Sequence, residues 1–292
     1  MWSKIWRMRG SLLALERYDR SAEAAAAQVM RHYSTSFSLA TRLLNPQVRV
    51  DIRNLYAMVR TADEIVDAGL DAQVAAPLLD AYEATVRAAP SQRFHTDPVV
   101  HAYALSARRC GFQDEHIAEF FASMRSDLTR TVHTAESFKT YVRGSAEVIG
   151  LLCLDTFYAG APRPDGVEEG AMCLGAAFQK INFLRDLHED SSELGRAYFP
   201  SLREPDKLDE ETKAAIIADI RDDLAHARTA LGLLPLGSRV GVAAATALFT
   251  ELTDLLESTP AHDIMSTRVS VPAARKAVLI SRAAALAARN KG

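Results

Sequence analysis

Apolar and polar residues along this chain follow the pattern of helices from near one end to the other. Ala, Leu, Arg and Glu dominate, and the alternation of β-branched residues that is typical of strands is scarce. The sequence therefore predicts an all-α protein. Helices are expected over about residues 22–34, 48–68, 72–88, 99–110, 114–130, 136–159, 166–192, 209–233, 240–257 and 272–289.

Capping and turn residues mark where several of these helices begin and end. Ser21 is expected to cap the first helix, and Asp97 followed by Pro98 provides a cap and a first-turn proline. Gly111 is expected to end the helix that starts there. The Pro- and Gly-rich stretches GAPRPDG, FPSLREP and LLPLGS indicate loops. No low-complexity linker and no fixed repeat occurs, so residues 21–292 are expected to form one domain.

A stripe of polar side chains interrupts the apolar stretch LYAMVRTADEIVD, residues 55–67. Its members, at steps of four, three and four, are Tyr56, Arg60, Asp63 and Asp67. Residues at that spacing share one face of a helix, and in most helices such a face carries the hydrophobic residues. Because the other positions are largely apolar, the helix itself is expected to be buried.

A second helix repeats this arrangement in GAAFQKINFLRDLHED, residues 175–190. Its polar stripe, again at steps of three and four, consists of Gln179, Asn182, Asp186 and Asp190. Phe178, Ile181, Phe183, Leu184 and Leu187 surround the stripe. A polar stripe on a buried helix must face something other than the core or bulk solvent.

Each stripe contains two aspartates four residues apart, Asp63 with Asp67 and Asp186 with Asp190. Like charges at that spacing destabilise an isolated helix by about 0.2–0.5 kcal/mol. In a buried setting they protonate unless a cation lies between them. One alternative is that they are solvated surface acids. Two such pairs, each in an apolar helix with an arginine nearby, favour a binding site instead.

The residue types in the two stripes indicate the ligand. Paired aspartates on facing helices suit Mg²⁺, which prefers oxygen ligands and phosphate partners. Arg60 and Arg185 beside such a site imply that the ligand is itself an anion, because the forked guanidinium donors match phosphate oxygens. Apolar surroundings indicate a hydrophobic remainder, which points to a prenyl diphosphate. The glycine-rich phosphate loop of kinases and ATPases does not occur in the sequence.

Composition and charge argue against several other classes of function. The chain of 292 residues is 48% hydrophobic and 24% charged, which is ordinary for a globular protein. A net charge of −3 provides no basic field, so no nucleic-acid partner is expected. The cysteines Cys110, Cys153 and Cys173 are widely spaced in apolar surroundings. They are expected to be buried thiols in a reducing compartment and not a disulfide framework or a zinc site.

The first 20 residues combine basic and aromatic side chains, namely Trp2, Lys4, Trp6, Arg7 and Arg9. They lack the apolar core and cleavage site of a secretory signal. No segment of the sequence reaches the roughly 20 apolar residues that a membrane span needs. Residues 1–20 are therefore either an ordinary tail or a contact with an anionic membrane surface. The expected location is cytoplasmic, with reversible peripheral attachment to a membrane.

Five stretches in combination resemble the squalene/phytoene synthase family, the head-to-head prenyl diphosphate synthases. They are YSTSFSLATRLL, LYAMVRTADEIVD, YVRGSAEVIG, AFQKINFLRDLHEDSSELGRAYFP and, more loosely, RVSVPAARK. The second and fourth resemble the two aspartate-rich signatures of the family, and the likeness extends from about residue 28 to about residue 280. The stretch FQKINFLRDLHED is similar to the corresponding stretch of bacterial phytoene synthases. The resemblance implies an isoprenoid-synthase-type helical bundle around a central apolar cavity.

The resemblance also implies which side chains form the site. Mg²⁺ ions, or Mn²⁺ as a substitute, would be held by Asp63, Asp67, Asp186 and Asp190. The diphosphate would be bound, or the metal shell completed, by Arg60, Arg185, Arg268, Gln179 and Asn182. The diphosphate of one of two substrates would contact Ser34, Ser36 and Tyr56, with Phe37 as a wall. Tyr141 would lie near the reacting carbons. Arg196 and Tyr198 match the end of the second signature, although a helix cap and anchor would also explain them.

The reaction implied by the resemblance joins two geranylgeranyl diphosphates through a cyclopropyl diphosphate to give phytoene and release diphosphate. One alternative is a squalene-type synthase that uses farnesyl diphosphate, and another is a cyclase acting on a single prenyl diphosphate. A non-catalytic helical scaffold is disfavoured because all four aspartates are present. Squalene formation would also require NADPH, which is not expected as a cofactor here.

Three positions depart from the family pattern. Thr35 stands where some relatives have a basic residue, which removes one possible diphosphate contact. Glu147 replaces a small residue in GSAEVIG and can pair with Arg143 one turn earlier. Phe249 stands where relatives carry a tyrosine, so a hydroxyl near the diphosphate would be lost.

Overall fold

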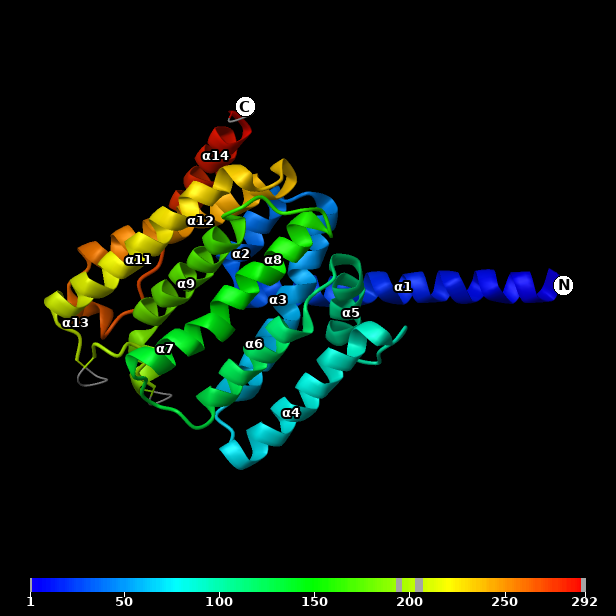
Figure 1. Cartoon of the computed structure of the whole chain (residues 1–292), viewed down its shortest axis with the longest axis horizontal. Coiled ribbons are helices and arrows are strands. Elements are labelled where there is room, and N and C mark those ends of the chain that lie inside the picture. Colours follow the sequence, from blue (N-terminus) through cyan, green and yellow to red (C-terminus); the bar gives the residue numbers. More distant parts are fainter. Residues whose placement is uncertain (1, 193–195, 203–206, 290–292) are drawn as a thin grey trace.

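The computed structural model describes the backbone of residues 2–192, 196–202 and 207–289, and the side chains of residues 13–189, 196–202 and 207–285. Within these described ranges, fourteen α-helices follow one another (Figure 1). They are α1 (Trp2–Tyr33), α2 (Thr35–Ala40), α3 (Pro46–Asp67), α4 (Ala72–Ala88), α5 (Pro98–Cys110), α6 (Asp114–Asp127), α7 (Ala135–Val142), α8 (Val148–Tyr158), α9 (Val167–Arg185), α10 (Leu187–Ser192), α11 (Glu210–Ala230), α12 (Leu236–Ser258), α13 (Ala261–Ile264) and α14 (Ala273–Arg289).

The predicted all-α fold is confirmed. Within the described ranges, the β pairing that occurs is a single isolated bridge between Val132 and Ala197. The helices pack as a bundle with α4 at one edge and α11 near the other, and α1 extends beyond the bundle (Figure 1). Searched over its described residues, the chain contains no helix that is long and apolar enough to cross a membrane.

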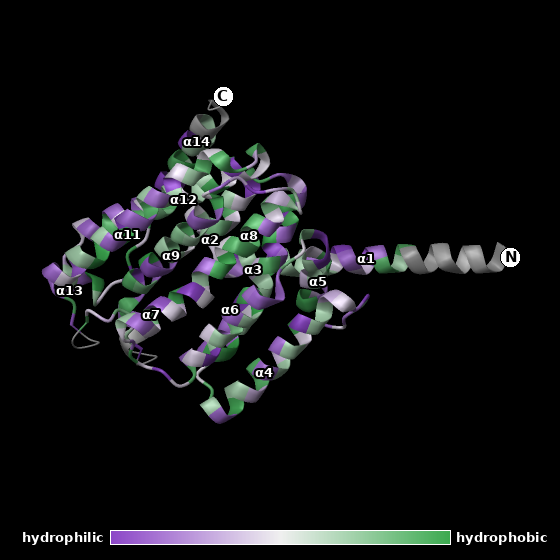
Figure 2. Cartoon of the chain, in the orientation of Figure 1, coloured by the Kyte–Doolittle hydropathy of each residue, from purple (hydrophilic) through white to green (hydrophobic). Residues whose placement is uncertain are grey.

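Two hydrophobic clusters form the interior of the bundle. The first joins α3, α4, α5, α6 and α8 through side chains such as Leu55, Phe120 and Leu152. The second joins α9, α11 and α12 through side chains such as Ile181 and Ile217. Helix α8 is hydrophobic along most of its length (Figure 2) and packs against both α3 and α9. Helix α8 therefore contacts both of the helices that carry the polar stripes.

Capping residues explain some helix boundaries and not others. The Asp97 carboxylate accepts hydrogen bonds from the backbone N–H groups of Val99 and Val100, and Gly111 ends α5 in the left-handed region at φ 70°. The predicted cap at Ser21 is wrong, because Ser21 lies inside α1. The residues before it, SLLALERYDR, are good helix formers, so the helix continues through them.

Two predicted helices contain irregular turns close to the polar stripes. The helix expected over residues 166–192 is interrupted at Asp186, which separates α9 from α10. The helix expected over residues 136–159 contains a π-helical turn, Arg143–Glu147, between α7 and α8. Periodicity of hydrophobic residues does not reveal such local changes of winding, which occur frequently at functional sites.

Glycines allow the helices around this turn to approach closely. A Cβ atom added to Gly144 would lie 2.4 Å from the carbonyl oxygen of Glu119 in α6. A Cβ atom added to Gly175 in α9 would lie 2.4 Å from the carbonyl oxygen of Ala146. Any larger residue would force these backbones apart, so glycine fixes the separation of α9 from the π turn.

The cysteines are free thiols, as expected for a chain that is not held by disulfides. Cys110 is buried, whereas Cys153 and Cys173 are only partly buried. Burial raises the pKa of Cys110 and of Cys153 to about 12, so both thiols stay protonated at neutral pH.

Candidate active site

The polar stripe of α3 lies at the border of the hydrophobic interior. Leu55, Met58 and Ala62 on the neighbouring faces of the helix are buried. The side chains of Arg60, Asp63 and Asp67 keep 27%, 35% and 32% of their surface exposed. The stripe is thus half-buried, and it faces neither the core nor bulk solvent alone.

Arg60 is the centre of contacts at one end of this stripe. Its Nη1 donates to the Asp63 carboxylate at 2.6 Å, and its Nη2 contacts the Glu64 carboxylate. Its guanidinium also lies over the ring of Tyr33, 4.5 Å from the ring centroid. Glu64 and Tyr33 had not been assigned to the site from the sequence, because neither falls on the stripe of α3.

The surroundings of Asp63 make its ionised form less stable than that of a solvent-exposed aspartate. Burial raises the pKa of Asp63 to about 6, and the neighbouring Asp67 adds to the rise, while Arg60 opposes it. Arg196 also opposes the rise, so the two arginines together do not fully offset the cost of two carboxylates in a half-buried setting. A bound cation would relieve this cost.

The second stripe presents Asp186 at the break between α9 and α10. Arg185 donates to it from Nε at 2.7 Å, and Arg268 contacts it from Nε at 3.0 Å. Gln179 and Asn182 are half-buried, and their side chains make no hydrogen bond within the described part of the chain. Asp190 belongs to α10, but its side chain lies outside the residues whose side chains the structure describes.

Arg196 connects the two signatures directly. It is 7% exposed, and its Nη1 donates to the Asp67 carboxylate at 2.7 Å. Its Nη2 donates to the backbone carbonyl of Val66 at 2.9 Å. Arg196 is therefore an anchor for the end of α3 and a neighbour of the first aspartate pair at the same time. Tyr198 lies beside it, with its ring stacked on Phe183 at 4.0 Å between centroids.

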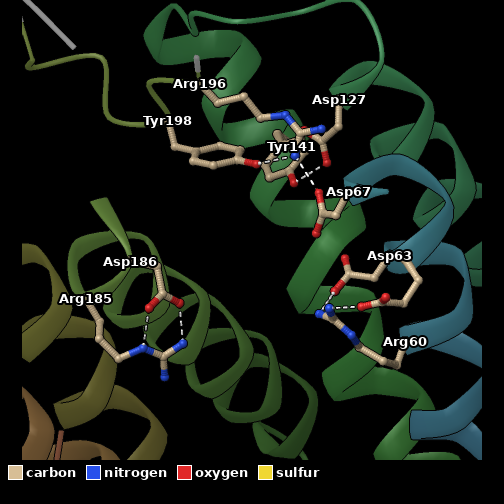
Figure 3. A network of polar contacts seen from close by, with 10 residues as sticks. Arg60, Asp63, Asp67, Asp127, Tyr141, Arg185, Asp186, Arg196 and Tyr198 are labelled. Carbon is tan, nitrogen blue, oxygen red and sulfur yellow. Dashed lines mark hydrogen bonds and ion pairs between the residues drawn. The ribbon is translucent and has the colours of Figure 1, made fainter. Parts of the chain in front are cut away.

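Tyr141 and Asp127 form a buried pair next to Arg196 (Figure 3). The Tyr141 hydroxyl donates to the Asp127 carboxylate at 2.7 Å, and the two residues are 4% and 8% exposed. Tyr141 was assigned to the site from the family motif. Asp127 was missed, because it is the last residue of α6 and its sequence context resembles any polar helix end.

Aromatic side chains line the other end of the α3 stripe. Phe37 contacts Tyr56, Phe178 and Phe249, with ring centroids 6.3, 5.9 and 5.4 Å apart. Phe249 also stacks on Phe178 at 3.9 Å. The phenylalanine at position 249 thus completes an apolar cluster. Burial raises the pKa of the Tyr56 hydroxyl to about 12, so it remains a neutral donor.

The residues around Ser34 begin helix α2. The Ser34 hydroxyl accepts a hydrogen bond from the Phe37 backbone N–H at 3.2 Å and so caps the helix. The Thr35 hydroxyl accepts a hydrogen bond from Lys276 of α14 at 3.0 Å. Burial lowers the pKa of Lys276, and the positive charge of Arg185 lowers it further. Ser36 is half-buried in the first turn of α2.

Lys276 was missed from the sequence although it ends the quoted stretch RVSVPAARK. Only the packing of α14 brings it to Thr35. Glu147 pairs with Arg143 as expected, at 3.6 Å, and Arg143 also contacts Glu119 at 2.9 Å. Glu147 therefore belongs to a network on the π turn.

The donor set fits an anion that carries divalent cations better than a bare metal ion. In the part of the chain that the structure describes, no three His, Cys, Asp or Glu side chains gather closely enough to hold a metal ion by themselves. Figure 3 shows Asp63 and Asp67 on one side of the view and Asp186 with Arg185 on the other. An arginine pairs with each of these three carboxylates. A ligand with both signs of charge, such as Mg²⁺-diphosphate, can exchange with both kinds of group.

The chain belongs to the squalene/phytoene synthase family, because the sequence profile of that family matches residues 30–275. A chloroplastic phytoene synthase of Zea mays is 26% identical over 282 residues, which cover 90% of this chain and 66% of that protein. A 15-cis-phytoene synthase of Synechococcus elongatus is 27% identical over 274 residues, which cover 85% of this chain and 88% of that protein. The chain spans 50% to 66% of the length of the first curated relatives it matches.

Solved structures share the fold over nearly the whole chain. A dehydrosqualene synthase in complex with a ligand superposes with a TM-score of 0.80 at 18% identity, covering 94% of this chain and 99% of that chain. A squalene synthase from Alicyclobacillus acidocaldarius superposes with a TM-score of 0.69 at 20% identity, covering 81% of this chain and 93% of that chain. These identities are low, so the structures establish the isoprenoid-synthase fold and not the substrate.

Proposed function

We propose that this chain is a Mg²⁺-dependent prenyltransferase that joins two prenyl diphosphates head to head. The observation that carries the proposal is that half-buried carboxylates on two helices of the bundle pair with arginines. Asp63 and Asp67 lie on α3, Asp186 lies at the end of α9, and Arg196 joins the second signature to the first.

The binding of diphosphate rests on this chain's cations and carboxylates. Asp63, Asp67, Asp186 and Asp190 are the proposed ligands of Mg²⁺, which would neutralise the charge that develops on a departing diphosphate. Arg60, Arg185, Arg268 and Lys276 are the proposed contacts to diphosphate oxygens. Gln179 and Asn182 on α9, whose side-chain amides make no hydrogen bond among the described residues, are further proposed contacts. Preorganised donors of this kind lower the barrier because they stabilise the leaving group in the transition state.

The apolar part of the site serves the prenyl chains. Loss of diphosphate from an allylic substrate leaves a carbocation, which water would quench. Phe37, Phe178 and Phe249 form a contiguous aromatic surface that excludes water and presents electron-rich ring faces. Tyr141, buried beside Phe183 and Tyr198, is the proposed neighbour of the reacting carbons.

Geranylgeranyl diphosphate is the proposed substrate and phytoene the proposed product. Support comes from the relatives, since those named above at 26% and 27% identity are phytoene synthases. A C30 synthase that uses farnesyl diphosphate is the second candidate, because structures of dehydrosqualene and squalene synthases share the fold. Chain length depends on which side chains close the apolar end of the site.

Product analysis separates these candidates. The purified protein is incubated with Mg²⁺ and either the C20 or the C15 diphosphate, and the extracted hydrocarbon is identified by mass spectrometry. A C40 hydrocarbon from the C20 substrate, with little product from the C15 substrate, is expected. A C30 product would support the second candidate. A cyclic product from a single substrate molecule would contradict head-to-head condensation.

A further inference from the structure

Asp127 is a buried carboxylate that the proposed chemistry has not yet used. It ends α6 and is 8% exposed. Its Oδ2 accepts the hydroxyl of Tyr141 at 2.7 Å, whereas its Oδ1 is buried and has no hydrogen-bond partner within the described residues. A buried carboxylate with one oxygen unpaired is destabilising, so its presence calls for an explanation.

The surroundings of Asp127 connect it to the candidate active site. Burial raises the pKa of Asp127 to about 7, while the charge of Arg196 opposes the rise and the charges of Asp63 and Asp67 add to it. Within the described part of the chain, the hydrogen bonds of Arg196 go to Asp67, to the backbone carbonyl of Val66 and, at 3.5 Å, to the hydroxyl of Tyr198, and not to Asp127. Tyr141 is therefore the one hydrogen-bonding partner of Asp127 among the described residues.

Aromatic side chains hold the ring of Tyr141 in place and leave its hydroxyl to be oriented separately. Its ring centroid lies 5.0 Å from that of His133, 5.3 Å from that of Tyr198 and 5.9 Å from that of Phe183. These contacts fix the plane of the ring, but they do not decide where the O–H bond points. The hydrogen bond to Asp127 sets the direction of the O–H bond.

We propose that Asp127 is a positioning residue that acts on the reaction through Tyr141, an inference that rests on the proposed function. Because the O–H group of Tyr141 donates to Asp127, its oxygen offers lone pairs, and not a proton, to its other neighbours. Donation to a carboxylate also increases the negative charge on the phenol oxygen. An oxygen so oriented stabilises an allylic cation, whereas a freely rotating hydroxyl would spend part of its time with the proton toward the cation.

Asp155 provides a matched control elsewhere in the bundle. It is 5% exposed in α8, its Oδ2 is also buried without a partner among the described residues, and burial raises its pKa to about 6. Its carboxylate pairs with Arg163, and neither residue belongs to a polar stripe. Replacing Asp155 tests what the loss of a buried carboxylate does to folding alone.

The test is a kinetic comparison of Asp127→Asn, Tyr141→Phe and the double variant, with Asp155→Asn as the control. We expect Asp127→Asn to lower kcat at least about tenfold while KM for the prenyl diphosphate changes less than about threefold. If Asp127 acts through Tyr141, the double variant is no slower than the slower single variant. Asp155→Asn is expected to keep the wild-type kcat.

A second variant, Asp127→Leu, separates a loss of activity from a loss of stability, because it replaces the buried charge by an apolar group of similar size. It is expected to match Asp127→Asn in kcat and to unfold at a temperature no lower than the wild type. Wild-type kcat in either Asp127 variant, or a double variant whose losses multiply, would overturn the proposal. Absence of hydrocarbon from the wild-type enzyme with both substrates would instead overturn the proposed function.

Discussion

Arginine side chains are the counterions of the described carboxylates in the site. Arg60 pairs with Asp63, Arg196 with Asp67, and both Arg185 and Arg268 with Asp186. An arginine that only balanced a carboxylate could be replaced by lysine at little cost. An arginine that also binds diphosphate could not, because lysine lacks the planar fork of donors.

Replacement of Arg60 by lysine distinguishes these roles. We expect Arg60→Lys to lower kcat/KM at least about tenfold, which corresponds to about 1.4 kcal/mol of transition-state stabilisation. Arg221 offers the matched control, since it also pairs with two carboxylates, Asp254 and Glu257, on the surface. Steady-state kinetics of both variants provide the measurement. Equal effects of Arg60→Lys and Arg221→Lys would mean that Arg60 is a local counterion only.

Spacing along one helix predicted part of the site, and contacts between helices supply the rest. Tyr56, Arg60, Asp63 and Asp67 could be read from a single stripe. Asp127 and Lys276 could not, because each stands on a different helix whose own pattern is ordinary. Long-range packing decides which polar residue of such a helix meets the stripe, and periodicity carries no information about packing.

Helix ends were predictable where a side chain caps the backbone locally. Asp97 and Gly111 mark both ends of α5. The predicted helix start at Ser21 was wrong because serine caps a helix only where the preceding residues are not helical. Here the preceding residues belong to α1. The break at Asp186 could not be predicted, because no proline or glycine stands beside it.

The close approach of α9 to the π turn gives a prediction at the scale of elements. Gly175→Ala places a methyl group 2.4 Å from the Ala146 carbonyl oxygen. We expect a loss of about 1–3 kcal/mol in the free energy of unfolding, as for an overpacked interior. A methyl group added at Gly232 meets nothing within 4 Å, so Gly232→Ala serves as the control in the same denaturant titrations. Equal stability of the two variants would refute this account of the contact.

Helix α1 is the proposed membrane contact. Residues 1–10 carry tryptophans and basic residues, and α1 extends beyond the bundle (Figure 1). Near an anionic surface each Lys or Arg adds about 1 kcal/mol of attraction. Deletion of residues 1–10 is expected to weaken sedimentation with anionic vesicles and slow turnover of vesicle-borne substrate, while activity in detergent is retained. A deletion variant that sediments like the full chain would place any membrane contact elsewhere.

At the scale of the whole molecule, the site lies where the two halves of the bundle meet. One hydrophobic cluster carries α3, and the other carries α9 and Tyr141. Arg196 bridges them through Asp67. The fold class followed from the sequence because helical periodicity runs through nearly all of it. The contact between Arg196 and Asp67 could not be predicted in this way, because the two residues are distant in the chain.

The ligand proposed to bridge the halves contains both metal and diphosphate. Thermal unfolding is therefore measured with Mg²⁺ alone, inorganic diphosphate alone, and both together. We expect the two together to raise Tm by more than the sum of their separate effects, because ligands that bind only the folded state stabilise it. Asp63→Asn and Asp186→Asn are expected to lose this combined effect while keeping the wild-type Tm without ligand within a few degrees. A rise in Tm that needs only one component, or that survives in both variants, would contradict a Mg²⁺-diphosphate site between α3 and α9.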